Sequence, residues 1–270
     1  MARLTIDPEK VAAVIAEIAE EKIAPRYGRL APGEIREKSG PNDLVTEVDE
    51  AVECALKKAL WDINPSALFI GEEAASKDPA LSGALAGDGS FWIVDPLDGT
   101  RNFVNGVNEF GTIVAFVENG EARMGWIYAA PDKKMAIAVK GDGATWAGEP
   151  INPKKPAGAR LIALRSLGFL PPARAEHMRG VLKEHFDSRP GYCSAYAYIA
   201  LARGLVDLKI SSRIHPWDHV AGALIAAEAG GAIAFLEDGA PYRPTPSVDR
   251  LLLGTAPGRD WKAIADVLRR

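Results

Sequence analysis

One stretch, residues 91–100, constrains this chain more than any other. It reads Phe-Trp-Ile-Val-Asp-Pro-Leu-Asp-Gly-Thr. The four apolar residues predict a buried strand, and Pro96 is expected to end its ladder because proline has no N–H to donate. Asp95 and Asp98 are then fixed at the end of a rigid element, beside a glycine and a hydroxyl. Hard divalent cations prefer carboxylate oxygens, so the pattern predicts a metal site that faces a phosphate.

Asp95 is difficult to explain without a metal ion. A carboxylate that ends an apolar strand is expected to be half-buried, and a buried charge needs a partner. After Asp95, no lysine or arginine follows before Arg101. A cation is therefore the simplest partner for this carboxylate.

Three other acidic clusters stand at the expected ends of elements, and each has a structural alternative. Thr46 and Asp49 have the spacing of a helix capping box. Glu72 and Glu73 follow a strand and a glycine, where a solvated turn would also carry charges. Asp218 is expected in the first turn of a helix, where the helix dipole favours a negative charge. Taken singly, these residues can be structural or functional.

Composition excludes several classes of protein. The net charge is −4 and the pI about 5.7, so nothing indicates a surface for nucleic acid. No apolar run approaches the roughly 18 residues needed to span a membrane, and the N-terminus reads as an amphipathic helix rather than a signal peptide. The two cysteines, Cys54 and Cys193, do not form a disulfide framework. We therefore expect a cytoplasmic protein with no nucleic-acid or membrane partner.

The pattern of elements changes near residues 149–158, which contain three prolines. Residues 1–150 predict an α+β part with an antiparallel sheet, and residues 151–270 predict an α/β part. Residues 26–45 are expected to form a loop. Helices are predicted from Pro8 to before Pro25, from near Thr46, over 173–186, 194–204 and 217–229, and from Asp260; strands are predicted over 67–70, 91–95, 111–117, 122–128, 135–139, 161–164, 206–210, 232–235 and 251–254, with a type I′ turn at Asn119-Gly120.

Taken together, the acidic clusters match a known family. From Lys38 to Gly231 the chain resembles the inositol monophosphatase family, the magnesium-dependent, lithium-sensitive phosphatases. This resemblance implies a layered αβαβα fold. It rests on four motifs in the family's order: Asp43-Leu-Val-Thr-Glu-Val-Asp49, Gly71-Glu72-Glu73, Trp92-Ile-Val-Asp-Pro-Leu-Asp-Gly-Thr100, and Pro216-Trp-Asp-His-Val-Ala-Gly222 with Glu228-Ala-Gly-Gly231.

The resemblance also implies a set of ligands for two or three Mg²⁺ ions. Glu72, Asp95 and the backbone carbonyl of Leu97 would hold the first ion. Asp95, bridging, would hold the second ion together with Asp98 and Asp218. A third, weaker ion would rest on Glu72 and waters. Two such ions can stabilise both the attacking and the leaving oxygen of an in-line displacement.

The nucleophile is then expected to be a water activated by the metal. Thr100 lies close enough to Asp98 in the chain for its hydroxyl to orient that water, and the resemblance adds Asp49 as the partner of Thr100. Gly99 lets the backbone approach the phosphate, and its N–H and that of Thr100 can bind phosphate oxygens. We therefore expect Thr100, Asp49 and Glu72 to be catalytic, and Asp98, Gly99 and Thr100 to contact substrate.

The substrate is less well defined than the reaction. Inositol-processing members carry a glutamate seven residues before the aspartate of the Trp-Asp motif, and this chain has Ser211 there. A small-residue signature of those members is also altered around Ser194, a further expected substrate contact. Arg213 can pair with a second anionic group on a substrate or be a surface arginine. Cys193 is expected to be a small buried residue, and His215 and His219 structural, because imidazole is a poor ligand for magnesium.

The sequence thus predicts a magnesium-dependent phosphatase of a small phosphate monoester, inositol monophosphate or a related sugar or alcohol phosphate. The resemblance also implies a homodimer. The enzyme alternatives are activity toward histidinol phosphate, fructose 1,6-bisphosphate or 3′-phosphoadenosine 5′-phosphate. A non-enzymatic alternative is a regulatory protein that binds the transcription machinery.

Overall fold

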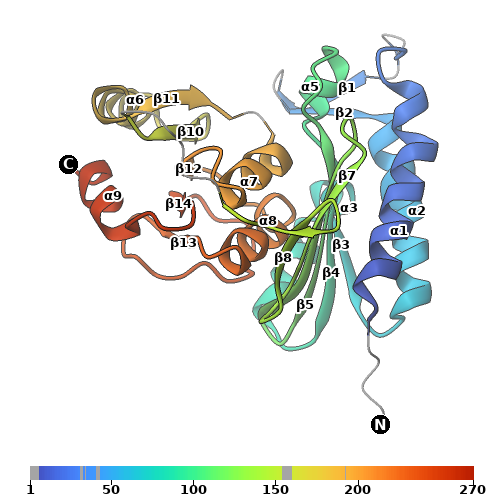
Figure 1. Cartoon of the computed structure of the whole chain (residues 1–270). Coiled ribbons are helices and arrows are strands. Elements are labelled where there is room, and N and C mark those ends of the chain that lie inside the picture. The colour runs from blue at the N-terminus through green and yellow to red at the C-terminus, as the bar shows by residue number, and fades with distance from the viewer. Residues whose placement is uncertain (1–5, 31–32, 34, 41–42, 154–159, 192) are drawn as a thin grey trace.

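Alternating layers of helix and sheet make up the computed structural model of this chain (Figure 1). It describes all residues except 1–5, 31–32, 34, 41–42, 154–159 and 192. From right to left in Figure 1, a helical pair, a seven-stranded sheet, a second helical pair, a five-stranded sheet and a third helical pair follow one another. The αβαβα arrangement expected from the resemblance is therefore confirmed.

The first outer layer consists of α1 (Pro8–Lys22) and α2 (Glu47–Ile63). The carboxylate of Asp7 accepts hydrogen bonds from two backbone N–H groups of the first turn of α1, and Thr46 caps α2. Both starts agree with the sequence prediction. The apolar faces of the two helices pack with one face of the larger sheet; the buried residues of α2 include Val48, Val52, Leu56 and Leu60.

The larger sheet has the strand order β3-β4-β5-β6-β7-β8-β9. The pair β3–β4 is parallel and the remaining neighbours are antiparallel. Positive φ angles of 52° at Asn119 and 72° at Gly120 fit the predicted type I′ turn between β5 and β6. The bounds are β3 (Leu68–Gly71), β4 (Ser90–Asp98), β5 (Gly111–Glu118), β6 (Glu121–Ala129), β7 (Lys134–Val139), β8 (Gly143–Trp146) and β9 (Glu149–Pro150).

Strand β4 continues past Pro96, so the predicted end of the ladder at Asp95 is wrong. Asp95 lies opposite Ile113 and Asp98 lies opposite Gly111, which leaves one extra residue on β4. Such a bulge tolerates proline because the bulged residues need not all donate to the neighbouring strand. The hydroxyl of Thr112 donates a hydrogen bond to the Pro96 carbonyl at 2.9 Å.

The predicted loop over residues 26–45 is also wrong in part. β1 (Ile35–Gly40) and β2 (Asp43–Thr46) form an antiparallel pair there. The sequence of β1, Ile-Arg-Glu-Lys-Ser-Gly, lacks the alternation of apolar and polar residues by which a strand is recognised. The backbone of β1 is held in an extended conformation by its pairing with β2 rather than by an apolar face.

The smaller sheet has the order β11-β10-β12-β14-β13, with parallel pairs around β10 and antiparallel pairs around β14. It is formed by β10 (Ile162–Ser166), β11 (Asp187–Pro190), β12 (Leu208–Ser211), β13 (Ala232–Phe235) and β14 (Leu252–Thr255). The polar β11 was not predicted. Helices α6 (Pro172–His185) and α9 (Trp261–Leu268) cover the outer face of this sheet.

Helices α7 (Ser194–Ala202) and α8 (Pro216–Glu228) lie between the sheets (Figure 1). α8 packs so closely on its neighbours that a Cβ at Gly222 would overlap the Tyr198 ring. One apolar cluster joins residues of both sheets through these helices. The predicted division at 149–158 falls partly on residues outside the described part, and a division into 1–150 and 151–270 stays a prediction.

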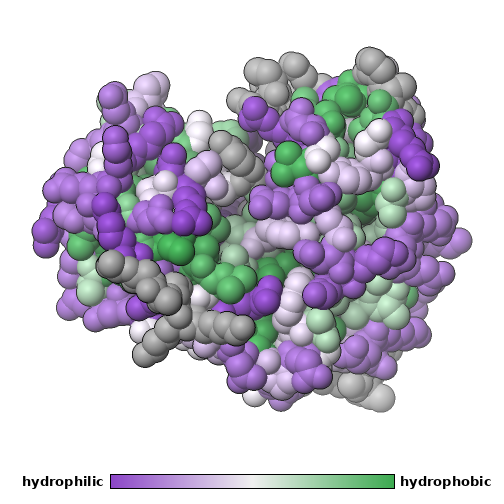
Figure 2. Space-filling model, turned by 45° about the horizontal axis from the view of Figure 1, so that its top comes forward, coloured by the Kyte–Doolittle hydropathy of each residue, from purple (hydrophilic) through white to green (hydrophobic). Residues whose placement is uncertain are grey.

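The outer parts of the face in Figure 2 are mostly hydrophilic, and hydrophobic side chains gather toward its middle. In the described part of the chain, no helix combines the length and the apolar character that crossing a membrane requires.

Candidate metal centre and active site

Three carboxylates meet where the larger sheet faces the central helices. Asp95 and Asp98 come from the bulged end of β4, and Asp218 comes from the first turn of α8. Each offers an oxygen, and these oxygens lie within 4.8 Å of one another. Asp95 and Asp98 are buried and Asp218 is half-buried. The fold thus brings together two motifs that are about 120 positions apart in the chain.

Burial and the charges of nearby carboxylates raise the pKa of each of these carboxyl groups. For Asp95, burial raises the pKa most, and the charges of Glu72, Asp98 and Asp218 raise it further. Burial likewise raises the pKa of Asp98 and of Asp218. A hard divalent cation fits this donor set, because the ligands are all oxygen and need a positive charge.

Thr100 and Asp49 form a hydrogen-bonded relay beside this cluster. The Thr100 hydroxyl lies 3.0 Å from Oδ1 of Asp49 and 2.9 Å from the carbonyl oxygen of Leu97, and its single proton can go to either. Oδ2 of Asp49 accepts hydrogen bonds from the N–H and the hydroxyl of Thr46, at 2.8 and 2.5 Å. Asp49 therefore combines the structural role of the capping box with a place in the site.

The backbone between the relay and the cluster is tightly built. Leu97 N–H donates to Oδ1 of Asp95 at 3.0 Å. Gly99 has a φ of +84°, and a Cβ there would lie 2.8 Å from the carbonyl oxygen of Glu109. Only glycine meets both demands, so Gly99 fixes where α5 (Thr100–Val104) starts and where the Thr100 hydroxyl lies.

Glu72 is held in place by a residue that the sequence did not single out. Glu72 is the first residue of α3 (Glu72–Lys77). The residue that holds this turn is Glu53, whose carboxylate accepts hydrogen bonds from the N–H groups of Glu73 and Ala74, at 2.8 and 3.0 Å. A Cβ at Gly71 would overlap that carboxylate. Glu53 lies one helical turn after Asp49 on α2, and that spacing is the signal that could have identified it.

Asp98 is held from the other side by the start of α7. The Cys193 thiol donates to Oδ2 of Asp98 at 2.9 Å, and Ala195 N–H donates to the same oxygen at 2.6 Å. Burial, together with the Asp98 charge, raises the pKa of the Cys193 thiol well above its usual range. Cys193 is thus buried as expected, and in addition it positions Asp98.

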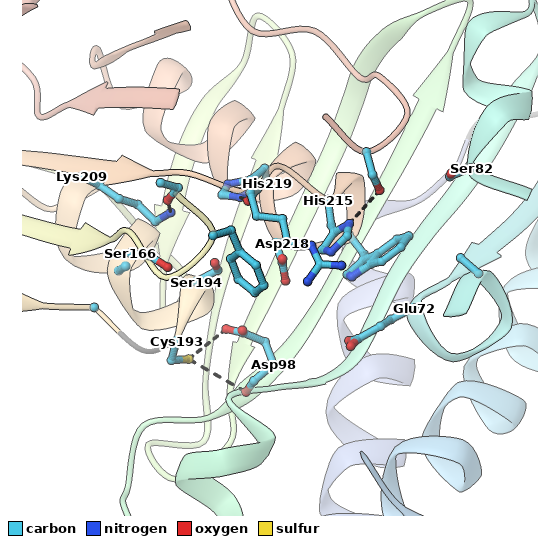
Figure 3. Close-up of a pocket in the computed structure, with 18 of the residues that line it drawn as sticks. Glu72, Ser82, Asp98, Ser166, Cys193, Ser194, Lys209, His215, Asp218 and His219 are labelled. Carbon is cyan, nitrogen blue, oxygen red and sulfur yellow. Dashed lines mark hydrogen bonds between the residues drawn. The ribbon is translucent and has the colours of Figure 1, made fainter. Parts of the chain in front are cut away.

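A cavity of about 940 Å³ opens beside the cluster. Figure 3 shows Glu72, Asp98 and Asp218 facing it, with Cys193 beside Asp98 and Ser194 above Cys193. Its lining comes from both sheets and from both central helices. A buried oxygen cluster on the wall of a cavity of this size can hold cations next to a small anionic ligand.

Comparison with known proteins agrees with this geometry. The model of the inositol monophosphatase family matches residues 7–268, nearly the whole chain. The chain belongs to the inositol monophosphatase family. Members of this family are phosphatases, so the chain is a phosphoric monoester hydrolase.

Curated relatives of this family member carry several activities in their names. It is 30% identical to the inositol-1-monophosphatase of Bacillus subtilis over 84% of this chain and 87% of that one. It is 30% identical to a fructose-1,6-bisphosphatase/inositol-1-monophosphatase of Thermotoga maritima, over 77% and 76% of the two chains. It is 29% identical to a histidinol-phosphatase of Mycobacterium tuberculosis, over 86% and 88%.

Solved structures share the fold. The IMPase of Thermotoga maritima superimposes with a TM-score of 0.79 at 24% identity, over 95% of this chain and 94% of that one. A staphylococcal inositol monophosphatase soaked in lithium chloride gives 0.79 at 20% identity, over 96% and 93%. An IMPase/NADP phosphatase complexed with Mg²⁺ and phosphate gives 0.77 at 19% identity, over 96% and 95%.

The remaining residues that the sequence singled out in this phosphatase line the same cavity. The Arg213 guanidinium stacks over the Phe169 ring, 4.3 Å from its centre. His215 stacks on Trp217 with ring centres 4.7 Å apart. His219 is buried, and its ring nitrogens lie 2.8 Å from the Tyr198 hydroxyl and 3.2 Å from the Arg213 carbonyl oxygen.

Lys209 is a cavity residue to which the sequence analysis gave no role. It is only 6% exposed, and its ammonium donates a hydrogen bond to the hydroxyl of Ser211 at 2.6 Å. Ser211 is the serine at the position where the resemblance expects a glutamate in inositol-processing members. The signal was available, since Leu-Lys-Ile-Ser places one lysine inside an apolar strand.

Proposed function

We propose that this family member hydrolyses a small phosphate monoester in a reaction that depends on Mg²⁺. One observation carries the proposal: the oxygens of Asp95, Asp98 and Asp218 converge within 4.8 Å, and two of these residues line the large cavity. The all-oxygen set favours magnesium over softer metals. The solved relative that binds Mg²⁺ and phosphate supports the same choice of ion.

The residues that would hold two or three Mg²⁺ ions are Glu72, Asp95, Asp98, Asp218 and the carbonyl of Leu97. When bound, the ions would lower the pKa of a water and neutralise charge on the phosphate. Hydrogen bonds from Cys193 and Ala195 fix the orientation of Asp98 before substrate arrives. Glu53 does the same for the turn that carries Glu72.

Thr100 is proposed to orient the attacking water. When its hydroxyl proton points to Oδ1 of Asp49, its oxygen lone pairs are free to accept a hydrogen bond from water. The Thr46 contacts hold Asp49 as the acceptor in this pair. The N–H groups of Gly99 and Thr100 are proposed to bind phosphate oxygens, and Ser194 and Arg213 to contact the rest of the substrate.

Lithium is expected to inhibit, as is excess Mg²⁺; the staphylococcal relative solved as a lithium-soaked inhibitory complex supports the first expectation. Inositol monophosphates, fructose 1,6-bisphosphate and histidinol phosphate are the candidate substrates that the relatives' names suggest. 3′-Phosphoadenosine 5′-phosphate, the regulatory role, the homodimer and the cytoplasmic location stay predictions.

The test is a panel of these phosphate esters, incubated with purified protein and assayed for inorganic phosphate. We expect hydrolysis of at least one ester with Mg²⁺, and none after exhaustive chelation. Activity that survived chelation, or that required zinc alone, would refute the proposal.

A further inference from the structure

The cavity is lined by residues of both charges. Its acidic residues are Glu72, Asp98 and Asp218. The smaller sheet and the loop after β12 supply three basic residues, Arg165 from β10, Lys209 from β12 and Arg213. A metal centre for one phosphate accounts for the acidic residues only.

Lys209 is the most deeply placed of these basic residues. It is 6% exposed, yet it lines the cavity, and Figure 3 shows its side chain extending from its strand into the pocket. Its ammonium donates to the Ser211 hydroxyl at 2.6 Å and lies 4.5 Å from the centre of the Tyr198 ring. Within the described part of the chain, no carboxylate lies within ion-pairing distance of it.

A buried ammonium without an anionic partner is unfavourable. In the protein without metal, the more distant charges of Asp218 and Asp98 favour the charged form of Lys209, while burial opposes it and lowers its pKa to about 8. Cations bound by those carboxylates would cancel their attraction for the ammonium. The charge of Lys209 then needs a partner that the described protein does not supply, and the Ser211 hydroxyl occupies only one of its three donors.

We propose that Lys209 binds a second anionic group of the substrate, so that the preferred substrates are phosphate esters carrying another phosphate or a carboxylate. This inference rests on the proposed function, because it places the reacting phosphate at the carboxylates. Arg213, over the Phe169 ring, and Arg165, hydrogen-bonded to Ser188 at 3.0 Å, are the other basic residues of the lining.

The test compares esters that differ in one group. D-3-Phosphoglycerate against glycerol 1-phosphate probes a carboxylate, and fructose 1,6-bisphosphate against fructose 1-phosphate probes a second phosphate. We expect the wild type to favour the doubly anionic member of at least one pair by at least about tenfold in kcat/KM. Lys209→Met should reduce that preference to within about twofold, and Lys209→Arg should retain part of it. Lys134→Met, an exposed strand lysine outside the cavity, is the matched control.

A second readout does not depend on turnover. Equilibrium binding of 3-phosphonopropionate against 3-hydroxypropylphosphonate, both with a C–P bond that the enzyme does not hydrolyse, should show the same preference and the same loss in Lys209→Met. If Lys209→Met does not fold, Lys209→Gln replaces it. The preference of the wild type for the doubly anionic ligand can be measured without any variant.

Two results would overturn the inference. One is a wild type without preference in any pair, and the other is a Lys209 variant that weakens both members of each pair equally, which would place Lys209 at the reacting phosphate. If no ester is hydrolysed at all, the proposed function fails instead, and the phosphonate pair still reports on Lys209.

Discussion

The hydroxyl of Thr100 lies 3.0 Å from the carboxylate of Asp49, a residue 51 positions earlier that also caps α2. The two oxygens of Asp49 divide these roles: Oδ2 accepts from Thr46 and Oδ1 faces Thr100. The start of the outer helix is thereby tied to the residue proposed to orient the attacking water.

Removing the Thr100 hydroxyl should affect turnover more than affinity. A group that orients the nucleophile acts mainly in the transition state, so Thr100→Ala is expected to lower kcat by ~10² to 10⁴ with little change in KM. Thr100→Ser, which restores the hydroxyl, should recover much of the rate. Steady-state kinetics on the best ester distinguish this role from ground-state binding, for which only KM would change.

Asp95→Asn should be nearly inactive but folded. Without metal, the raised pKa of Asp95 means that its charge opposes folding at neutral pH. The variant is therefore expected to unfold at a higher temperature than the wild type in chelator and to gain less from added Mg²⁺. Asp62→Asn, an exposed change on α2, is the control. A folded Asp95 variant with near-normal turnover would contradict the metal centre.

Asp49 should make the metal-free fold less stable as the pH rises. Burial raises its pKa from 3.8 to about 6, so between these values the folded state holds a proton that the unfolded state has lost. The free energy of unfolding, measured as wild type minus Asp49→Asn, should fall by about 2 kcal/mol between pH 4 and 6 and become level by about pH 7. Urea titrations of both proteins across this pH range measure the difference. If the difference in free energy of unfolding rose with pH, Asp49 would have a lowered pKa in the folded state and the prediction would be wrong.

Glu53→Gln should weaken metal binding without touching a proposed ligand. An amide nitrogen cannot accept a hydrogen bond, so either Glu73 N–H or Ala74 N–H loses its partner and the turn that carries Glu72 loosens. Mg²⁺ affinity, measured from the metal-induced shift in melting temperature, should fall by about 10- to 100-fold. Glu50→Gln, on the same helix but paired with Arg36 and Lys77, should leave it unchanged.

Much of the fold was predictable because local signals agreed with it. Asp7 and Thr46 marked helix starts, and Asn119-Gly120 marked a hairpin. Polar strands such as β1 and β11 could not be recognised, because backbone pairing rather than an apolar pattern holds them. The bulge at Pro96 depends on how β4 pairs with the neighbouring strand β5, and the residues around Pro96 do not predict that register.

The candidate site was predictable where one short motif carries it. Asp95, Asp98 and Thr100 lie within six residues, whereas Asp218 reaches them only through the packing of α8 between the sheets. Glu53 was missed and Lys209 was given no role, because both act through contacts across the fold. Glu53 contacts the turn after β3, and Lys209 lies beside Tyr198.

The most direct test of the metal centre is the release of inorganic phosphate by chelator-treated protein as Mg²⁺ is added back. Wild type and Asp218→Asn, both checked for folding, are compared on the best ester of the panel. We expect wild-type activity to appear with Mg²⁺ and to be inhibited by lithium, and the variant to remain nearly inactive at any Mg²⁺ concentration. Equal activity of the two proteins, or wild-type hydrolysis before Mg²⁺ is added, would contradict the account.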